Sequence, residues 1–265
     1  MVNYLRSMSR NLPQPERPVL VLLAALGLVS VAGCRKDVAP PAYQTVVNFV
    51  DTIAIPPNSI ADADGNIYST TVIGNQRWMA ENLRTGHYAN GDPIPYLPDN
   101  TAWLSLTAGA WSNYASDAAY GDIYGKLYNW YTVVDPQSVC PSGWHVPTDA
   151  DWMELEENLG VPVYDLDNAG SRGAAANAGG RLKADVLWIS PNTGATDSSS
   201  FSAFPGGVRT NSGNFQDIGL YGYWWSASEF NSSQAWYRSL VNNDAGVVRY
   251  NGPKHIGASI RCVED

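Results

Sequence analysis

Basic residues are scarce in this chain, and the shortage excludes one large class of partners. The 265 residues include 16 Lys and Arg against 25 Asp and Glu, which gives a formal net charge of −9. A nucleic-acid surface needs clustered Lys and Arg to neutralise phosphates, and the sequence contains no such cluster. We therefore expect no nucleic-acid partner.

The sequence also lacks an apolar run long enough to span a bilayer as a stable helix. The apolar stretch at residues 19–29 follows several arginines and is shorter than the roughly 20 residues that a transmembrane helix needs. The small residues of Val-Ala-Gly then precede Cys34, a pattern that resembles the bacterial lipobox. We expect a signal peptide at residues 1–33 and a diacylglycerol anchor on Cys34. An ordinary signal peptide with an incidental cysteine and a retained membrane anchor are the alternatives.

Only three cysteines are present, so sulfur chemistry is limited. After Cys34, an exported chain would keep Cys140 and Cys262, and an even remainder indicates one disulfide. Two free buried thiols are the alternative. A lipid anchor would place the protein at a membrane, in the periplasm or at the cell surface, and we expect the outer membrane.

Catalytic and metal-binding motifs are missing as well. The three histidines are far apart, and no G-x-S-x-G or H-E-x-x-H pattern occurs. The acidic run at residues 62–66 has neither the Gly at the sixth position nor the Glu at the twelfth that an EF-hand requires, so we interpret it as a polar turn. Residues 242–244 resemble a lectin-type calcium group only weakly. We predict no catalytic residue, no metal and no cofactor.

The clearest local signal is a helix over residues 148–160. Thr148 is a suitable N-cap with Asp151 three residues later, and Gly160 is suited to end the helix. An apolar stripe would face a partner surface and consists of Trp152, Leu155 and Leu159. We expect the glutamates to be solvated, namely Glu154, Glu156 and Glu157.

The remainder predicts a tether followed by a β-rich domain. Residues 34–59 contain four prolines and predict a tether, although residues 46–55 could instead form a short docking strand. The folded domain is expected over residues 60–265. Alternation and turn signals predict strands at 67–73, 76–79, 224–228, 235–241, 247–250 and 259–263. A short helix is expected at 124–131 and a mobile glycine-rich loop at 170–180.

A long irregular segment at residues 84–123 offers the best binding candidates. It carries four aromatic residues among Asn and Asp, and these are Trp103, Trp111, Tyr114 and Tyr120. Aromatic rings beside short polar side chains suit sugars or extended peptides. The alternative is that these four rings pack in the core.

Several sequence blocks resemble a known family. DADGNIYSTTVIGNQRWMAENLRT, YGKLYNWYTVV, CPSGWHVPTDADWMELEENLG, FSAFPGGVR, YWWSAS and SIRCV resemble, in that order, the Fibrobacter succinogenes major paralogous domain of bacterial surface lipoproteins. The resemblance covers about residues 60–265. That domain is in turn similar to sulfatase-modifying-factor and C-type-lectin-like domains.

The resemblance implies a fold and a pairing of cysteines. It implies an α+β, C-type-lectin-like fold with a twisted antiparallel β core, few helices and long irregular loops. It also favours a Cys140–Cys262 bridge. The copper-binding cysteines of formylglycine-generating enzymes have no counterpart at residues 222–230, so we expect no oxidation chemistry.

These patterns together predict a non-enzymatic surface lipoprotein. Its partners would be the membrane, through the lipid on Cys34, and an extracellular glycan or protein ligand. The alternatives are a structural component of a cell-surface or adhesin assembly and an enzyme that acts on polysaccharide or protein.

Overall fold

A computed structural model describes residues 55–265. Several predicted features lie outside the described residues, namely the signal peptide at 1–33, the expected lipid site Cys34, residues 34–54 of the tether and all but the last residue of the possible strand at 46–55. Within the described part, no helix has both the length and the apolar character needed to cross a bilayer.

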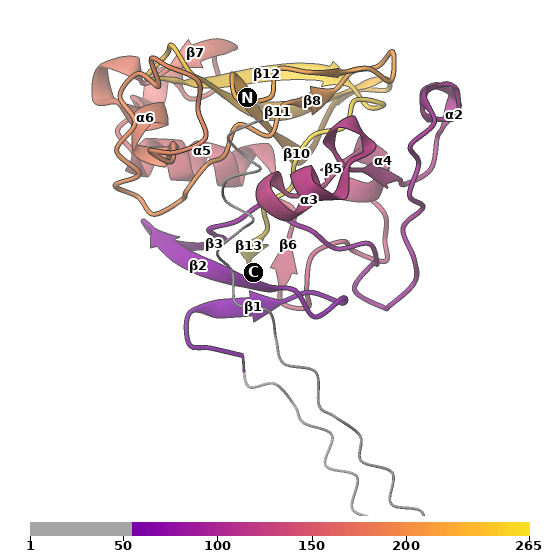
Figure 1. Ribbon diagram of the computed structural model, residues 1–265. Helices are drawn as coiled ribbons and strands as arrows, with labels where there is room; N and C mark the ends of the chain where they lie inside the picture. Colours follow the sequence, from indigo (N-terminus) through magenta and orange to yellow (C-terminus); the bar gives the residue numbers. More distant parts are fainter. Residues whose placement is uncertain (1–54) are drawn as a thin grey trace, which may run out of the picture. The chain divides into compact units, whose positions relative to one another are not determined.

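Two antiparallel sheets form the frame of the domain (Figure 1). The first has five strands in the order β1-β2-β3-β13-β6. Its strands are β1 (Ser59–Ala61), β2 (Ile67–Ile73), β3 (Gln76–Met79), β6 (Trp144–His145) and β13 (Val263–Glu264). β2 and β3 form the predicted hairpin, with Thr71 opposite Trp78. Of the last predicted strand, only Val263 belongs to β13, which pairs with both β3 and β6.

The second sheet has four strands in the order β10-β11-β12-β7. They are β7 (Gly170–Arg172), β10 (Tyr221–Asn231), β11 (Gln234–Val241) and β12 (Val247–Pro253). β10, β11 and β12 confirm the predicted C-terminal strands. The prediction of a mobile loop at 170–180 is wrong, because β7 pairs with β12 and the backbone N–H groups of Gly179 and Gly180 donate to the Ala245 carbonyl at 2.7 and 3.2 Å.

Short helices and two small strand pairs complete residues 55–265. The α-helices are α2 (Asn100–Ser105), α3 (Ala118–Tyr124), α4 (Trp130–Val133), α5 (Asp149–Asn158) and α6 (Ala178–Leu182). The 3-10 helices are η1 (Tyr114–Ser116), η2 (Val163–Asp165) and η3 (Ala174–Ala176). The strand pairs join β4 (Trp111–Ser112) to β5 (Leu127–Tyr128) and β8 (Val208–Arg209) to β9 (Phe215–Gln216). Residues 84–123 thus contain several elements, and the helix predicted at 124–131 is replaced by the end of α3, β5 and α4.

The helix α5 lies between the two sheets (Figure 1). Its predicted capping box is confirmed: Asp151 N donates to Thr148 Oγ1 at 3.2 Å, and Thr148 N donates to Asp151 Oδ2 at 2.7 Å. The ring of Trp152 packs 4.8 Å from that of Trp78 on β3, and its Nε1 donates to the Trp225 carbonyl on β10 at 3.3 Å. The helix therefore joins both sheets through one tryptophan.

One prediction about α5 is wrong. Glu154 and Glu157 are exposed as expected, but Glu156 is completely buried. Its carboxylate accepts hydrogen bonds from Arg238 Nε at 2.5 Å and Arg172 Nη2 at 2.6 Å. The reason is that the second sheet presents arginines to this side of the helix, and a carboxylate that meets such partners can be buried.

The arginines of the second sheet bind a second carboxylate at the start of α5. Arg238 Nη1 and Arg249 Nη2 each lie 2.7 Å from an oxygen of Asp149. Burial alone would raise the pKa of Asp149, but the hydrogen bonds and charges of Arg249 and Arg238 outweigh burial and lower it. We call Asp149, Glu156, Arg172, Arg238 and Arg249 the charge cluster.

The disulfide expected from the family resemblance is present in the structure. Cys140 and Cys262 are bonded to each other and are fully buried. Their sulfur atoms belong to one apolar core that includes Trp130 and Trp225, whereas a second core surrounds Trp152. The bridge ties the segment before β6 to the segment before β13.

Candidate functional site

The structure separates the four aromatic residues predicted to bind ligand. Trp103 is only 1% exposed, its Nε1 donates to the His255 carbonyl at 2.6 Å, and the guanidinium of Arg209 lies 4.2 Å from its ring centre. As a ligand contact Trp103 is therefore a wrong prediction, because α2 turns the ring inward where apolar area is buried.

Tyr114 and Tyr120 lie together, but their rings mainly contact other rings. Their centres are 5.4 Å apart, and Tyr114 is 5.3 Å from Phe215 on β9, while Tyr120 is 6.2 Å from Tyr124. Both are half-buried. This cluster fixes α3 against the β8–β9 pair.

Trp111 is also half-buried, and its ring already has two neighbours. The ring of Tyr96 packs 4.6 Å away, and Lys126 Nζ lies 3.8 Å from the indole centre. The indole Nε1 donates to the Ile94 carbonyl at 2.9 Å. The four predicted residues thus do not converge on one site.

Tyrosines that the sequence analysis did not select gather on one face of the second sheet. Tyr221 and Tyr223 alternate along β10, and on the neighbouring strands Tyr237 stands directly opposite Tyr250. Ring centres are 5.6 Å apart for Tyr221 and Tyr223, 5.7 Å for Tyr223 and Tyr237, and 6.3 Å for Tyr237 and Tyr250. The tyrosines therefore form a continuous row across three strands.

A groove of about 290 Å³ runs beside this row. Tyr223 and Tyr237 line it, and Pro253 and Ile256 form another apolar part of its wall. Its polar lining residues are Thr210, Asn211, Gln216, Asp217 and Asn251. We call this hollow, together with Tyr221 and Tyr250 beside it, the tyrosine groove.

Burial raises the pKa of two phenols of the groove, those of Tyr223 and Tyr237. Tyr223 Oη donates to Asp217 Oδ2 at 2.9 Å, and burial together with this carboxylate raises the pKa of Tyr223. Burial raises the pKa of Tyr237 to about 12. Tyr250 is 52% exposed, so its ring is accessible to a ligand. The groove thus offers apolar ring surface next to neutral hydroxyl and amide groups.

The helix α5 covers the opposite face of the same strands, whereas the tyrosine face is only partly covered, since Tyr223 and Tyr237 pack against the first apolar core and Tyr250 is exposed. Trp224, Arg238 and Arg249 stand directly across from one another on β10, β11 and β12. The two arginines bind Asp149, so α5 covers that face. A sequence signal existed, since tyrosines two residues apart in a strand share a face. The sequence did not reveal which face the helix would cover.

Comparison with known proteins places the chain in a family. A family model described as Fibrobacter succinogenes major domain (Fib_succ_major) matches residues 72–264. The chain belongs to this family. No curated protein and no solved structure matches it. The α+β class with antiparallel sheets is confirmed, whereas the likeness to sulfatase-modifying-factor and C-type-lectin-like domains stays a prediction.

The match to the Fibrobacter succinogenes major domain includes both the groove and its support. It begins in β2 and ends in β13, so α5, the disulfide and all four tyrosines of the row lie inside it. The groove is therefore formed within the family domain.

Other polar groups in the described part do not form a metal site. Among residues 55–265, no three His, Cys, Asp or Glu side chains are grouped in a way that could hold a metal ion. The acidic run at 62–66 is a polar turn, as predicted, because Asp62 Oδ1 accepts from the backbone N–H groups of Asp64 and Asn66, both at 2.9 Å. His145 is held between Asp151 and Asp265, at 3.2 and 2.7 Å.

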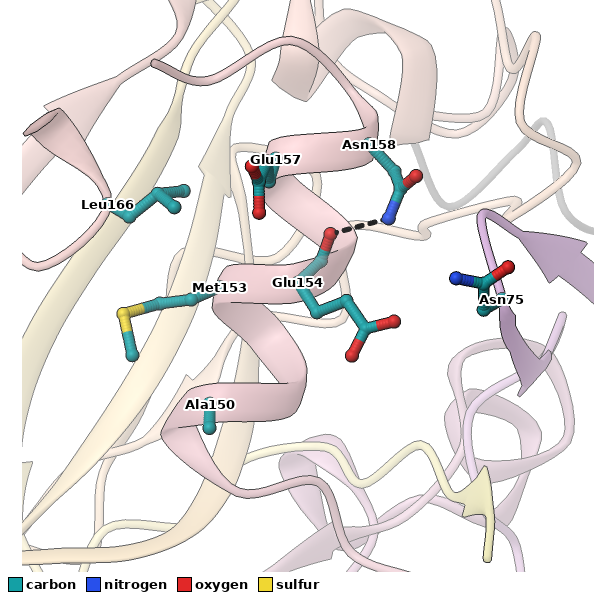
Figure 2. A pocket seen from close by; sticks show the side chains of 7 residues that line it. All are labelled: Asn75, Ala150, Met153, Glu154, Glu157, Asn158 and Leu166. Atoms are coloured by element: carbon teal, nitrogen blue, oxygen red, sulfur yellow. Dashed lines mark hydrogen bonds between the residues drawn. The ribbon is translucent and has the colours of Figure 1, made fainter. Parts of the chain in front are cut away.

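Another hollow lies on the outer side of α5, and Figure 2 shows it as a broad space with few contacts across it. Its volume is about 610 Å³. Glu154 points toward the β2–β3 turn that carries Asn75, and the one hydrogen bond drawn joins Asn158 Nδ2 to the Glu154 carbonyl at 2.9 Å. The hollow is lined by exposed carboxylates rather than by rings, so we favour the tyrosine groove as the ligand site.

Proposed function

We propose that this protein is a lipid-anchored surface protein whose domain binds an extracellular polysaccharide without cleaving it. The tyrosine groove carries the proposal. Sugar rings present C–H groups that stack on aromatic faces and hydroxyls that bond to short polar side chains, and the groove supplies both. The sequence around Cys34 supports attachment to the membrane through a lipid.

The chain's charge favours a neutral polymer. The net charge is −9, and Asp217 adds a carboxylate inside the groove. A polymer rich in carboxylates or sulfates would be repelled by this field, whereas a neutral chain is unaffected. We therefore expect neutral polysaccharides to bind better than acidic ones.

The binding test uses the full chain, purified in detergent, in native gels cast with soluble xylan, glucan, mannan or pectin. We expect at least one neutral polymer to retard migration. Tyr250→Ala should weaken binding about two- to twelvefold, because one ring contact contributes roughly 0.5–1.5 kcal/mol. Tyr164→Ala is the matched control, since Tyr164 is 82% exposed and lies on η2, outside the groove.

Four outcomes would contradict this function. The tyrosine groove would be refuted as the binding site if none of the four polymers retarded migration. It would also be refuted if Tyr250→Ala and the parent chain bound equally well. Release of shorter sugars would indicate an enzyme. Stable co-purification with a surface protein and no polymer binding would indicate a structural component of an assembly.

The anchor is tested separately by labelling cells with a radioactive fatty acid. We expect label on the parent chain and none on Cys34→Ser. Equal labelling of both proteins would refute attachment at Cys34, and the binding proposal would be unaffected.

A further inference from the structure

A second hollow, distinct from the tyrosine groove, lies beside α3. Its volume is about 300 Å³, at the lower end of the range for small-molecule pockets. The lining residues that matter here are Asp64, Trp111, Asn113, Gly121, Asp122 and Lys126. We call it the Trp111 pocket.

The ammonium group of Lys126 belongs to the pocket lining and has no hydrogen-bond acceptor among the described residues. Its side chain is half-buried over the Trp111 indole, and no residue among 55–265 accepts a hydrogen bond from its Nζ or forms a salt bridge with it. Burial lowers the pKa of Lys126, which is the expected effect of removing an ammonium from water. An ammonium has three N–H donors, so this one is available to a bound molecule.

Asn113 adds a second polar group that lacks a partner. It is 8% exposed, and its Oδ1 is buried with no hydrogen-bond partner in the described part of the chain. Gly121 makes room for this amide, because a Cβ at Gly121 would lie 2.2 Å from Oδ1. A buried amide without partners is unfavourable by about 1–3 kcal/mol, and a bound donor would relieve that.

The carboxylates of the pocket balance its cations. Asp64 is already engaged, since its Oδ2 accepts the Gly86 N–H at 2.6 Å and its Oδ1 contacts His87. Asp122 is exposed on α3 and free to accept. Arg84 also lines the pocket but is paired with Glu81 at 2.7 Å, so Lys126 and Asp122 are the uncommitted charges of the lining, and they are opposite in sign.

This balance selects the chemistry of the ligand. A hydroxyl both accepts and donates, so neighbouring hydroxyls can accept from Lys126 and donate to Asp122 or to Asn113 Oδ1. A single ion would satisfy one charge and be repelled by the other. The Trp111 ring already contacts Tyr96 at 4.6 Å and Lys126 Nζ at 3.8 Å, so we do not assign it a stacking role. Recognition here depends on hydrogen bonds.

We propose that the Trp111 pocket binds one neutral sugar residue through adjacent hydroxyls, with Lys126 as donor and Asn113 and Asp122 as the complementary groups. The pocket shares no lining residue with the tyrosine groove. The protein thus has two sugar sites of different chemistry, one that stacks on rings and one that uses hydrogen bonds.

The test titrates the full chain in detergent with glucose, galactose and mannose, and then with glucuronate and glucosamine, using calorimetry. At least one neutral hexose should bind with a dissociation constant below about 10 mM, and at least about tenfold more tightly than either charged sugar. Lys126→Met should weaken binding about ten- to a hundredfold, the usual effect of losing one charge-assisted hydrogen bond.

Further variants keep the result interpretable. Asp122→Asn alters an exposed side chain and should also weaken hexose binding. This variant therefore tests the proposal even if Lys126→Met does not fold. Tyr164→Ala lies outside both hollows and should leave hexose binding unchanged. A hexose signal that is lost in Tyr250→Ala but kept in Lys126→Met would belong to the tyrosine groove and would count against the Trp111 pocket, so failure here is distinguishable from failure of the tyrosine groove. No hexose binding, tighter binding of glucuronate, or unchanged binding in both Lys126→Met and Asp122→Asn would overturn the proposal.

Discussion

The charge cluster gives the sharpest test of how α5 is held. Glu156→Gln keeps the size of the side chain and removes its charge. In the parent chain this carboxylate meets Arg238 at 2.5 Å and Arg172 at 2.6 Å, and the side chains of both arginines are 1% exposed. The substitution therefore removes the anion that the two buried guanidinium groups share.

The expected loss follows from that burial. Removing one partner of a buried pair is unfavourable by about 3–5 kcal/mol, because the remaining charge is neither paired nor hydrated. Arg238 keeps Asp149, but Arg172 keeps only its bond to the Leu166 carbonyl, and its Nε has no partner in the described residues. A loss of this size is a large part of the roughly 5–15 kcal/mol that stabilises a typical domain.

The assay is urea unfolding at neutral pH, followed by tryptophan fluorescence, for the parent chain and two variants. Glu154→Gln is the matched control, since it makes the same chemical change two residues away on the exposed side of α5. We expect the control to stay within about 0.5 kcal/mol of the parent chain. Equal midpoints for Glu156→Gln and Glu154→Gln would refute the reasoning.

Three further predictions concern the same scaffold. The lowered pKa of Asp149 means that its stabilisation is complete above the unfolded value near 4 and is lost as pH falls through the folded value, so the urea midpoint should fall below about pH 4, and less so in Asp149→Asn. Reducing the Cys140–Cys262 bridge, which spans 122 residues, should lower the free energy of unfolding by about 5 kcal/mol in the chain-entropy model, and a midpoint unaffected by reductant would contradict this. Gly179→Ala should destabilise the fold by about 1–3 kcal/mol or more, because the new Cβ would lie 1.9 Å from the Gly246 carbonyl oxygen. The control is Gly206→Ala, whose Cβ would lie at an ordinary 3.4 Å from Tyr124. Equal melting temperatures for the two variants would argue against the contact.

Local signals were readable from the sequence, and contacts between distant segments were not. Thr148 and Asp151 are three residues apart, so their capping box follows from helix geometry alone. The β2–β3 hairpin is equally local. By contrast, Glu156 is buried because its carboxylate binds Arg172 and Arg238. These two arginines lie 16 and 82 residues away in the chain. The spacing of apolar residues within α5 does not predict those partners.

The glycine-rich segment and the aromatic residues show the same limit. Gly179 and Gly180 look like loop residues, yet both are buried. The missing side chain of Gly179 allows the backbone of residues 245–246 to approach, and that of Gly180 allows the Gly194 carbonyl to approach. Trp103 lies in the segment that seemed best suited to binding, and its ring is in the interior. The sequence shows which residues of the segment are aromatic. Whether each ring is buried depends on which distant segments of the chain pack against it.

The two faces of the second sheet have separate roles, and this separation follows from strand geometry. Tyr237 and Arg238 are neighbours on β11 and therefore point to opposite sides. Arg238 holds α5 by its charge, while Tyr237 lines a groove that contributes little to that attachment. Side chains of the groove lie on the face away from α5, so we expect substitutions among them to leave the attachment of the helix intact, and the binding proposed for the groove can be altered separately from the stability of the fold.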